Sequence, residues 1–237
     1  MRTINHIALG AAFALAAPAA ANHVDFISDG PFDLTTSGAE VTQTTTGSSA
    51  NILGGTRNVS LIRDGGFGGT ISATLPNGGT AIRVDNSTVA AGTLVLSYPN
   101  IGGSDFTTMW DSIAVSIPVL ENSFPAGDGE INLSVSVADS STMATVFANG
   151  TGLAPGRIED PGTFYFMFDD FVGVDFTDVQ SLSVTFDTAI IGTVFEIDGI
   201  TRELVNAPPP APVPGPAGFA LFGLGALGIG LARRKRS

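Results

Sequence analysis

Apolar and polar side chains alternate over short segments throughout the middle of this 237-residue chain. One such segment carries Ile131, Leu133, Val135 and Val137, separated by asparagine and serine. A period of two with one polar face is the pattern of a half-buried antiparallel strand, whereas an amphipathic helix repeats every 3.6 residues. Outside its two ends the chain has no segment of helical period. The sequence therefore predicts an all-β domain.

Glycine-rich turns separate the candidate strands. Pro76-Asn77-Gly78-Gly79 lies between two of them and is typical of a hairpin loop. About ten short strands joined by turns of uneven length predict an antiparallel β-sandwich, jelly-roll-like, over residues 22–206. Besides 131–137, the candidate strands are 57–63, 71–75, 80–85, 92–98, 113–117, 143–148, 163–168, 182–187 and 194–204.

Aromatic residues are expected to fill much of the core, because the chain has sixteen phenylalanines. The run from Phe164 to Phe168 is apolar without alternation, which favours a strand covered on both faces. An exposed aromatic platform for a sugar is the alternative interpretation. Trp110, the single tryptophan, is expected in the core.

Charge and cysteine content exclude several classes of function. Residues 23–206 hold all 22 acidic side chains but only five arginines, a net charge of −17 that opposes binding to nucleic acid. The chain has no cysteine, which removes thiolate metal sites and cysteine nucleophiles. Its two histidines lie near the N-terminus, so histidine-based catalysis is disfavoured. We therefore do not expect an enzyme.

The N-terminus has the pattern of a secretory signal peptide over residues 1–21. Arg2 precedes an apolar run over residues 7–17, and Ala19 and Ala21 are the small residues of a cleavage site before Asn22. We expect this segment to form a signal helix that is removed after export.

The C-terminus is predicted to be a stiff linker over residues 207–216, a transmembrane helix over 217–232 and a basic cytoplasmic tail over 233–237. The uncharged run is long enough for roughly 24 Å of helix, somewhat less than a bilayer core of about 30 Å. The cluster Arg233, Arg234, Lys235 and Arg236 should stop transfer and stay in the cytoplasm, which places the acidic domain outside.

This C-terminus resembles the PEP-CTERM sorting signal of Gram-negative bacteria. The motif reads Val213, Pro214, Gly215, Pro216 and Ala217, followed by the apolar run and the arginine-rich end. The commonest family motif has glutamate where this chain has Gly215. The resemblance implies recognition by an exosortase, cleavage near the motif, and an inner-membrane intermediate that is then delivered to the cell surface or an exopolysaccharide matrix. An ordinary single-span anchor is the alternative.

Carboxylates near the end of the domain suggest two possible places for a calcium ion. Asp169 and Asp170 follow the aromatic run and could ligate Ca²⁺, the only cofactor that the sequence leaves open. Residues 195–200, which include Asp198, resemble the closing strand of carbohydrate-binding-module jelly rolls, and that resemblance implies a structural Ca²⁺ nearby. A solvated acidic loop and a bulge at Asp198 explain the same residues equally well.

Taken together, these patterns favour an exported, surface-anchored, non-enzymatic β-sandwich protein with a structural or adhesive role, in contact with the membrane and an exosortase. A carbohydrate-binding module with a structural Ca²⁺, and therefore polysaccharide as a partner, is the alternative function. A secreted glycoside hydrolase, which would need two facing carboxylates, is the third.

Overall fold

The computed structural model describes residues 23–38, 40–123, 126–148, 156–188 and 190–205, which belong to one compact unit. The first strands are β1 (His23–Asp25), β2 (Phe32–Thr36), β3 (Val41–Thr46), β4 (Thr56–Gly66), β5 (Ile71–Leu75), β6 (Ile82–Asn86), β7 (Ala90–Tyr98), β8 (Ser112–Ile117) and β9 (Val119–Ser123). The others are β10 (Ala126–Asp128), β11 (Ile131–Ala138), β12 (Met143–Phe147), β13 (Arg157–Ile158), β14 (Gly162–Met167), β15 (Ser181–Thr188), β16 (Thr193–Ile197) and β17 (Gly199–Glu203). Two 3₁₀ turns, η1 (Leu53–Gly55) and η2 (Phe168–Asp170), complete the described elements.

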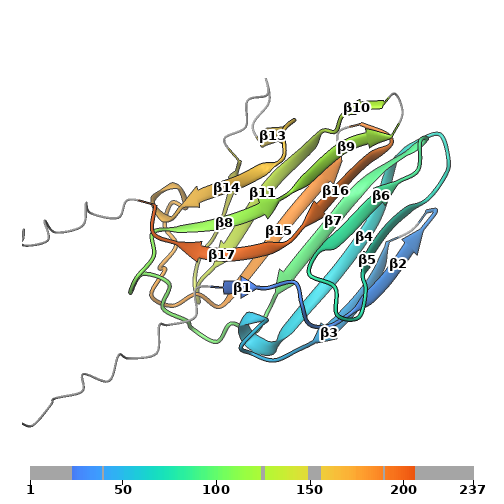
Figure 1. Ribbon diagram of the computed structural model, residues 1–237. Coiled ribbons are helices and arrows are strands. Elements are labelled where there is room, and N and C mark those ends of the chain that lie inside the picture. The colour runs from blue at the N-terminus through green and yellow to red at the C-terminus, as the bar shows by residue number, and fades with distance from the viewer. Residues whose placement is uncertain (1–22, 39, 124–125, 149–155, 189, 206–237) are drawn as a thin grey trace, which may run out of the picture. The chain divides into compact units, whose positions relative to one another are not determined.

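The strands form an antiparallel β-sandwich, as the alternation predicts (Figure 1). One layer is a seven-stranded sheet in the order β12-β11-β15-β7-β4-β3, with β13 also paired to β11. The other layer combines a six-stranded sheet, β10-β9-β16-β6-β5-β2, with a four-stranded sheet, β1-β17-β8-β14. These two sheets are continuous because β8 runs into β9 across Pro118 and β16 runs into β17 across Asp198.

The core lies between the two layers. Strand β11 buries the four aliphatic residues of its alternating pattern, and β15 buries Leu182, Val184 and Phe186 in the same way. Phe186 from the seven-stranded sheet stacks on Phe195 from the opposite layer, with 5.5 Å between ring centroids. The apolar face of each sheet is therefore buried against the other, while the polar positions of the same strands face outward.

A buried ion pair ties the N-terminal strand to the seven-stranded sheet. Arg57 Nη1 donates to Asp25 Oδ2 at 2.6 Å, and both side chains are fully buried. Tyr98 Oη donates to the same oxygen at 2.8 Å, and burial raises the pKa of Tyr98 well above its usual value. Asp25 Oδ1 accepts a hydrogen bond from the backbone N–H of Ile27, whose φ of 52° is strained for a β-branched residue.

A second carboxylate organises loops at one end of the sandwich. Asp139 accepts hydrogen bonds from the backbone N–H groups of Ser141 and Thr142 in its own turn, and of Asp175 in the loop before β15. The bond from Asp175, followed by those from its own turn, lowers the pKa of Asp139 to about 2. The acidic residues of this loop are thus engaged within it: Asp175 caps a turn by accepting from the backbone N–H of Thr177, and Asp178 accepts from the side-chain amide of Gln180.

The expectation that the aromatic run from Phe164 to Phe168 is covered on both faces is wrong. Its strand, β14, lies at the edge of the four-stranded sheet, and its side chains still alternate. Phe166 is buried, whereas Tyr165 points the other way and is 44% exposed. An edge strand has one face on the core, and nothing in the sequence of the strand itself distinguishes the edge from the centre.

Trp110 is not a core residue either. It is half-buried just before β8, and the guanidinium carbon of Arg202 lies 4.0 Å from the centroid of its ring. Arg202 occupies an inward position on β17 and also lies 4.8 Å from the ring of Phe106. The two aromatic faces give the buried cation a favourable electrostatic environment, which explains why Trp110 lies beside it.

The predicted strand over 194–204 is two strands. β16 pairs with β6 and β9, and β17 pairs with β8 and β1, so the chain passes from one sheet to the next at Asp198. The predicted hairpin at 76–79 is confirmed: Gly79 N donates to Pro76 O at 2.8 Å, and Gly78 takes the positive φ that the turn requires.

The predicted signal helix and C-terminal helix lie outside the described residues. Where the structure is described, no helix is long and apolar enough to cross a membrane.

Candidate functional site

The outward face of the seven-stranded sheet carries a continuous row of small polar side chains, which we call the central rung. Thr44 on β3 lies opposite Asn58 on β4, and Asn58 lies opposite Ser97 on β7. The register continues from Ser97 to Ser183 on β15, then to Ser136 on β11 and Thr145 on β12. The central rung therefore crosses six strands: Thr44, Asn58, Ser97, Ser183, Ser136 and Thr145.

A second row lies beside the central rung, two residues along each strand. It has the same small polar character except at two places, where Val95 and Phe147 stand. Its members, from β3 to β12, are Thr42, Ser60, Val95, Thr185, Ser134 and Phe147. The two rows form a polar surface that contains two apolar side chains, Val95 and Phe147.

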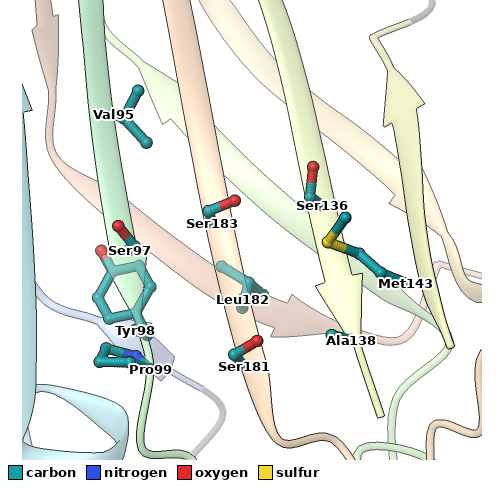
Figure 2. Close-up of a pocket in the computed structure, with 10 residues that line it drawn as sticks. All are labelled: Val95, Ser97, Tyr98, Pro99, Ser136, Ala138, Met143, Ser181, Leu182 and Ser183. Carbon is teal, nitrogen blue, oxygen red and sulfur yellow. The ribbon is translucent and has the colours of Figure 1, made fainter. Parts of the chain in front are cut away.

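A depression of about 270 Å³ lies over β7, β15, β11 and β12. Figure 2 shows Ser97, Ser183 and Ser136 side by side on three neighbouring strands, with Met143 from β12 beside Ser136. The depression is lined by Val95, Ser97, Tyr98, Pro99, Ser136, Ala138, Met143, Ser181, Leu182 and Ser183. It therefore combines hydroxyl groups with apolar walls.

Several hydroxyl groups of this surface are available to a ligand. At its two ends the central rung is internally bonded: Thr44 Oγ1 donates to Asn58 Oδ1 at 2.8 Å, and the Ser136 and Thr145 hydroxyls are 2.7 Å apart. In its middle, within the described part of the chain, Ser97 and Ser183 make no side-chain hydrogen bond to protein. A hydroxyl can donate one hydrogen bond and accept two, so this pair can bond to hydroxyl groups of a ligand.

Neither row contains a charged side chain, although the domain carries a net charge of −17. Two carboxylates lie beside the rows and accept hydrogen bonds from neighbouring side chains. Glu40 accepts a hydrogen bond from Ser60, and Asp187 accepts one from Asn132 at 3.3 Å. A neutral, hydroxyl-rich surface suits an uncharged polar ligand and offers nothing to neutralise an ionic one.

The aspartates predicted from the sequence do not converge on one site. Asp169 and Asp170 are exposed on η2, after β14, whereas Asp198 is exposed at the junction of β16 and β17. Over the described ranges, no group of three or more His, Cys, Asp or Glu side chains is arranged to hold a metal ion. These three aspartates therefore do not form a calcium site together.

Three of the six glutamates that could serve a glycosidase form ion pairs with arginine. Glu130 and Glu159 both pair with Arg157, and Glu196 pairs with Arg83 at 3.0 Å. A carboxylate that is engaged by a guanidinium is less available to act on a glycosidic bond.

The other residues singled out in the sequence belong to its two ends. The cleavage residues Ala19 and Ala21, the motif from Val213 to Ala217, and the cluster from Arg233 to Arg236 all lie outside the described residues.

Comparisons with known proteins show only distant likeness. No protein-family model matches the chain. No curated protein matches it by sequence.

Solved structures with similar architecture include the family 11 carbohydrate-binding module of the cellulosomal cellulase Lic26A-Cel5E of Clostridium thermocellum, with 12% identity and a TM-score of 0.35 over 77% of this chain and 94% of that one. They also include a variant of the Cel12A cellulase of Rhodothermus marinus, with 12% identity and a TM-score of 0.39 over 73% and 100%. A third is TmCBM61 in complex with β-1,4-galactotriose, with 11% identity and a TM-score of 0.30 over 68% and 88%. The β-sandwich of this chain thus resembles carbohydrate-binding modules at a distance, and at these TM-scores the likeness carries no functional argument.

Proposed function

We propose that this protein is a non-catalytic polysaccharide-binding protein and that the outward face of its seven-stranded sheet binds the sugar chain. The observation that carries the proposal is the central rung, an uncharged row of hydroxyl and amide groups across six strands. Polysaccharides are long and densely hydroxylated, so an extended row of small hydrogen-bonding groups matches their chemistry. The depression beside Met143 and Val95 supplies apolar contact for the faces of sugar rings.

The charge of the domain favours neutral polysaccharides over anionic ones as the ligand. Because the domain carries a net charge of −17, an anionic chain such as an alginate is repelled, whereas a neutral glucan, galactan or mannan is not. Binding to the neutral polymers should therefore vary little with salt concentration.

Replacing Ser183 with arginine should weaken neutral polysaccharide binding about tenfold or more, a loss of roughly 1.4 kcal/mol. Ser183 is the central rung's contribution from β15 and lines the depression, so a long side chain there obstructs the surface and removes one free hydroxyl. Affinity electrophoresis in gels that contain a soluble glucan, galactan or mannan measures the effect.

The matched control is Ser72→Arg. Ser72 is also a half-buried serine in the middle of a strand, β5, but it lies on the opposite layer. The Ser72→Arg substitution should leave both polysaccharide binding and the unfolding midpoint unchanged. If the wild-type protein binds none of these neutral polymers, or if the two variants weaken binding equally, the outward face of the seven-stranded sheet is not the binding site.

We further propose that the protein reaches the cell surface through the sorting signal at its C-terminus, where it would act as an adhesive or structural component of a polysaccharide matrix. The order of proline-rich motif, apolar run and arginine cluster over residues 213–236 supports this route. Intact mass spectrometry on the protein from membrane, surface and medium fractions of its native host tests it. We expect a mature chain that begins at Asn22 and ends near Pro216. A chain that keeps Arg236 in every fraction would contradict processing.

A further inference from the structure

Strand β12 forms one edge of the seven-stranded sheet. It pairs with β11 on one side, and no described strand pairs with its other side. An edge strand of this kind presents a row of backbone N–H and C=O groups that can pair with another strand. The outer end of the central rung, Thr145, lies at the middle of this five-residue strand.

The hydrogen bonds of the β11–β12 pair show which residues of β12 face the open side. At one end of the strand Asp139 N donates to Thr142 O, and at the other end Ala148 N donates to Leu133 O. In an antiparallel pair, alternate residues bond to the partner strand, so the even-numbered residues from 142 to 148 bond toward β11. The backbone groups of Met143, Thr145 and Phe147 therefore point to the open side.

The residues of this edge include none of the charges or prolines that keep many edge strands from pairing. Its sequence, Met-Ala-Thr-Val-Phe, contains no charge, no proline and no glycine. Met143 is 72% exposed and Phe147 is 51% exposed, and both stand on the outward face of the sheet beside Thr145. The opposite edge strand, β3, presents only threonines on that face and has no large apolar side chain there.

We propose that β12 is a self-association surface, at which the β12 strands of two copies pair antiparallel about a two-fold axis through Thr145. In this register Thr145 lies opposite its own symmetry mate, and Met143 lies opposite Phe147 of the second copy. All three residues with open backbone groups then form hydrogen-bonded pairs. A register centred one residue away leaves one of the three unpaired, so the length of the strand selects Thr145 as the centre.

Side chains favour the same register. Each Met143 packs its thioether against the ring of the second copy's Phe147, and the two-fold axis makes this contact twice. The exposed apolar side chains of the edge are thus covered by one another. The central rung would continue from one copy into the next without a charged residue, which doubles the length of the neutral face.

The dimer should be weak in dilute solution. Two five-residue strands bury far less than the roughly 1,600 Å² of a standard interface, and each domain carries a net charge of −17. We expect a dissociation constant in the roughly micromolar to millimolar range, and tighter association at higher salt, which screens the repulsion.

Sedimentation velocity of the full chain in excess detergent, at concentrations up to about 1 mM, tests the surface. Thr145→Lys places two lysines opposite each other on the axis and should abolish the dimer, because like charges directly opposite repel. Thr44→Lys, at the other end of the central rung, is the matched control and should leave the dimer intact. Absence of a wild-type dimer over this range, or a dimer that survives Thr145→Lys, overturns the proposal.

A charge-complementation experiment tests the register. Met143→Lys and Phe147→Glu should each weaken the homodimer, because each places a charge against an apolar side chain twice. Mixing the two variants should restore a heterodimer, in which one lysine faces one glutamate and the other contact is unchanged. Native mass spectrometry distinguishes the two chains by mass. A mixture that stays monomeric while the wild type dimerises would show that Met143 and Phe147 do not face each other.

Discussion

Replacing Arg57 with alanine is expected to lower the free energy of unfolding by about 3–5 kcal/mol, the usual cost of breaking a buried ion pair on one side. Asp25 is fully buried and would keep Tyr98 and the N–H of Ile27 as partners but lose its counter-charge. Arg57 Nη2 also donates to the backbone carbonyls of Asp29 at 2.8 Å and Gly30 at 2.9 Å. One substitution would therefore release β1 and the segment that follows it.

Urea unfolding followed by circular dichroism measures this loss. The matched control is Arg63→Ala on the same strand, because Arg63 makes an exposed hydrogen bond to Ser37 O and should cost less than about 0.5 kcal/mol. The double variant Asp25→Leu with Arg57→Met removes both charges and should be less destabilised than Arg57→Ala. If Arg57→Ala costs no more than Arg63→Ala, the ion pair does not hold the N-terminal strand to the sheet.

The strands of the core were predictable because each carries its own signal. β11 and β15 alternate over their whole length, and both are interior strands of the seven-stranded sheet with one face on the core and one in solvent. The period of two reflects that environment directly. The sandwich class therefore follows from the sequence without knowledge of which strands are neighbours.

Strand β3 was not predictable in the same way. Its residues, Val-Thr-Gln-Thr-Thr-Thr, give no apolar alternation because a buried hydroxyl, that of Thr45, stands where a core residue is expected. Thr45 is tolerated there because its hydroxyl donates to the carbonyl of Arg57 across the strand pair. The Asp25–Arg57 pair could not be predicted from local sequence patterns either, because 32 positions separate the partners.

The candidate binding face depends on register, which sequence patterns leave open. The polar positions of each strand were visible, but only as the solvent side of a half-buried strand. Strands that are neighbours in the sheet are far apart in the chain, as β7 and β15 are, and a shift of one residue would turn every side chain to the other face. The alignment of Ser97, Ser183 and Ser136 therefore emerges only in the folded sheet.

Replacing Phe186 with alanine should also lower the free energy of unfolding by about 3–5 kcal/mol, because the substitution removes a ring that packs between the two layers and leaves a cavity there. Phe186 and Phe195 are both fully buried and stack with their centroids 5.5 Å apart. Close packing on every side prevents the core from collapsing into the space left by the ring. Urea unfolding gives the loss, and Phe67→Ala is the matched control, because Phe67 is 95% exposed and its removal should cost less than about 0.5 kcal/mol. A loss for Phe186→Ala as small as that of the control would mean that the two sheets do not pack through this pair, and the outward orientation of the hydroxyl surface on β15 would lose its basis.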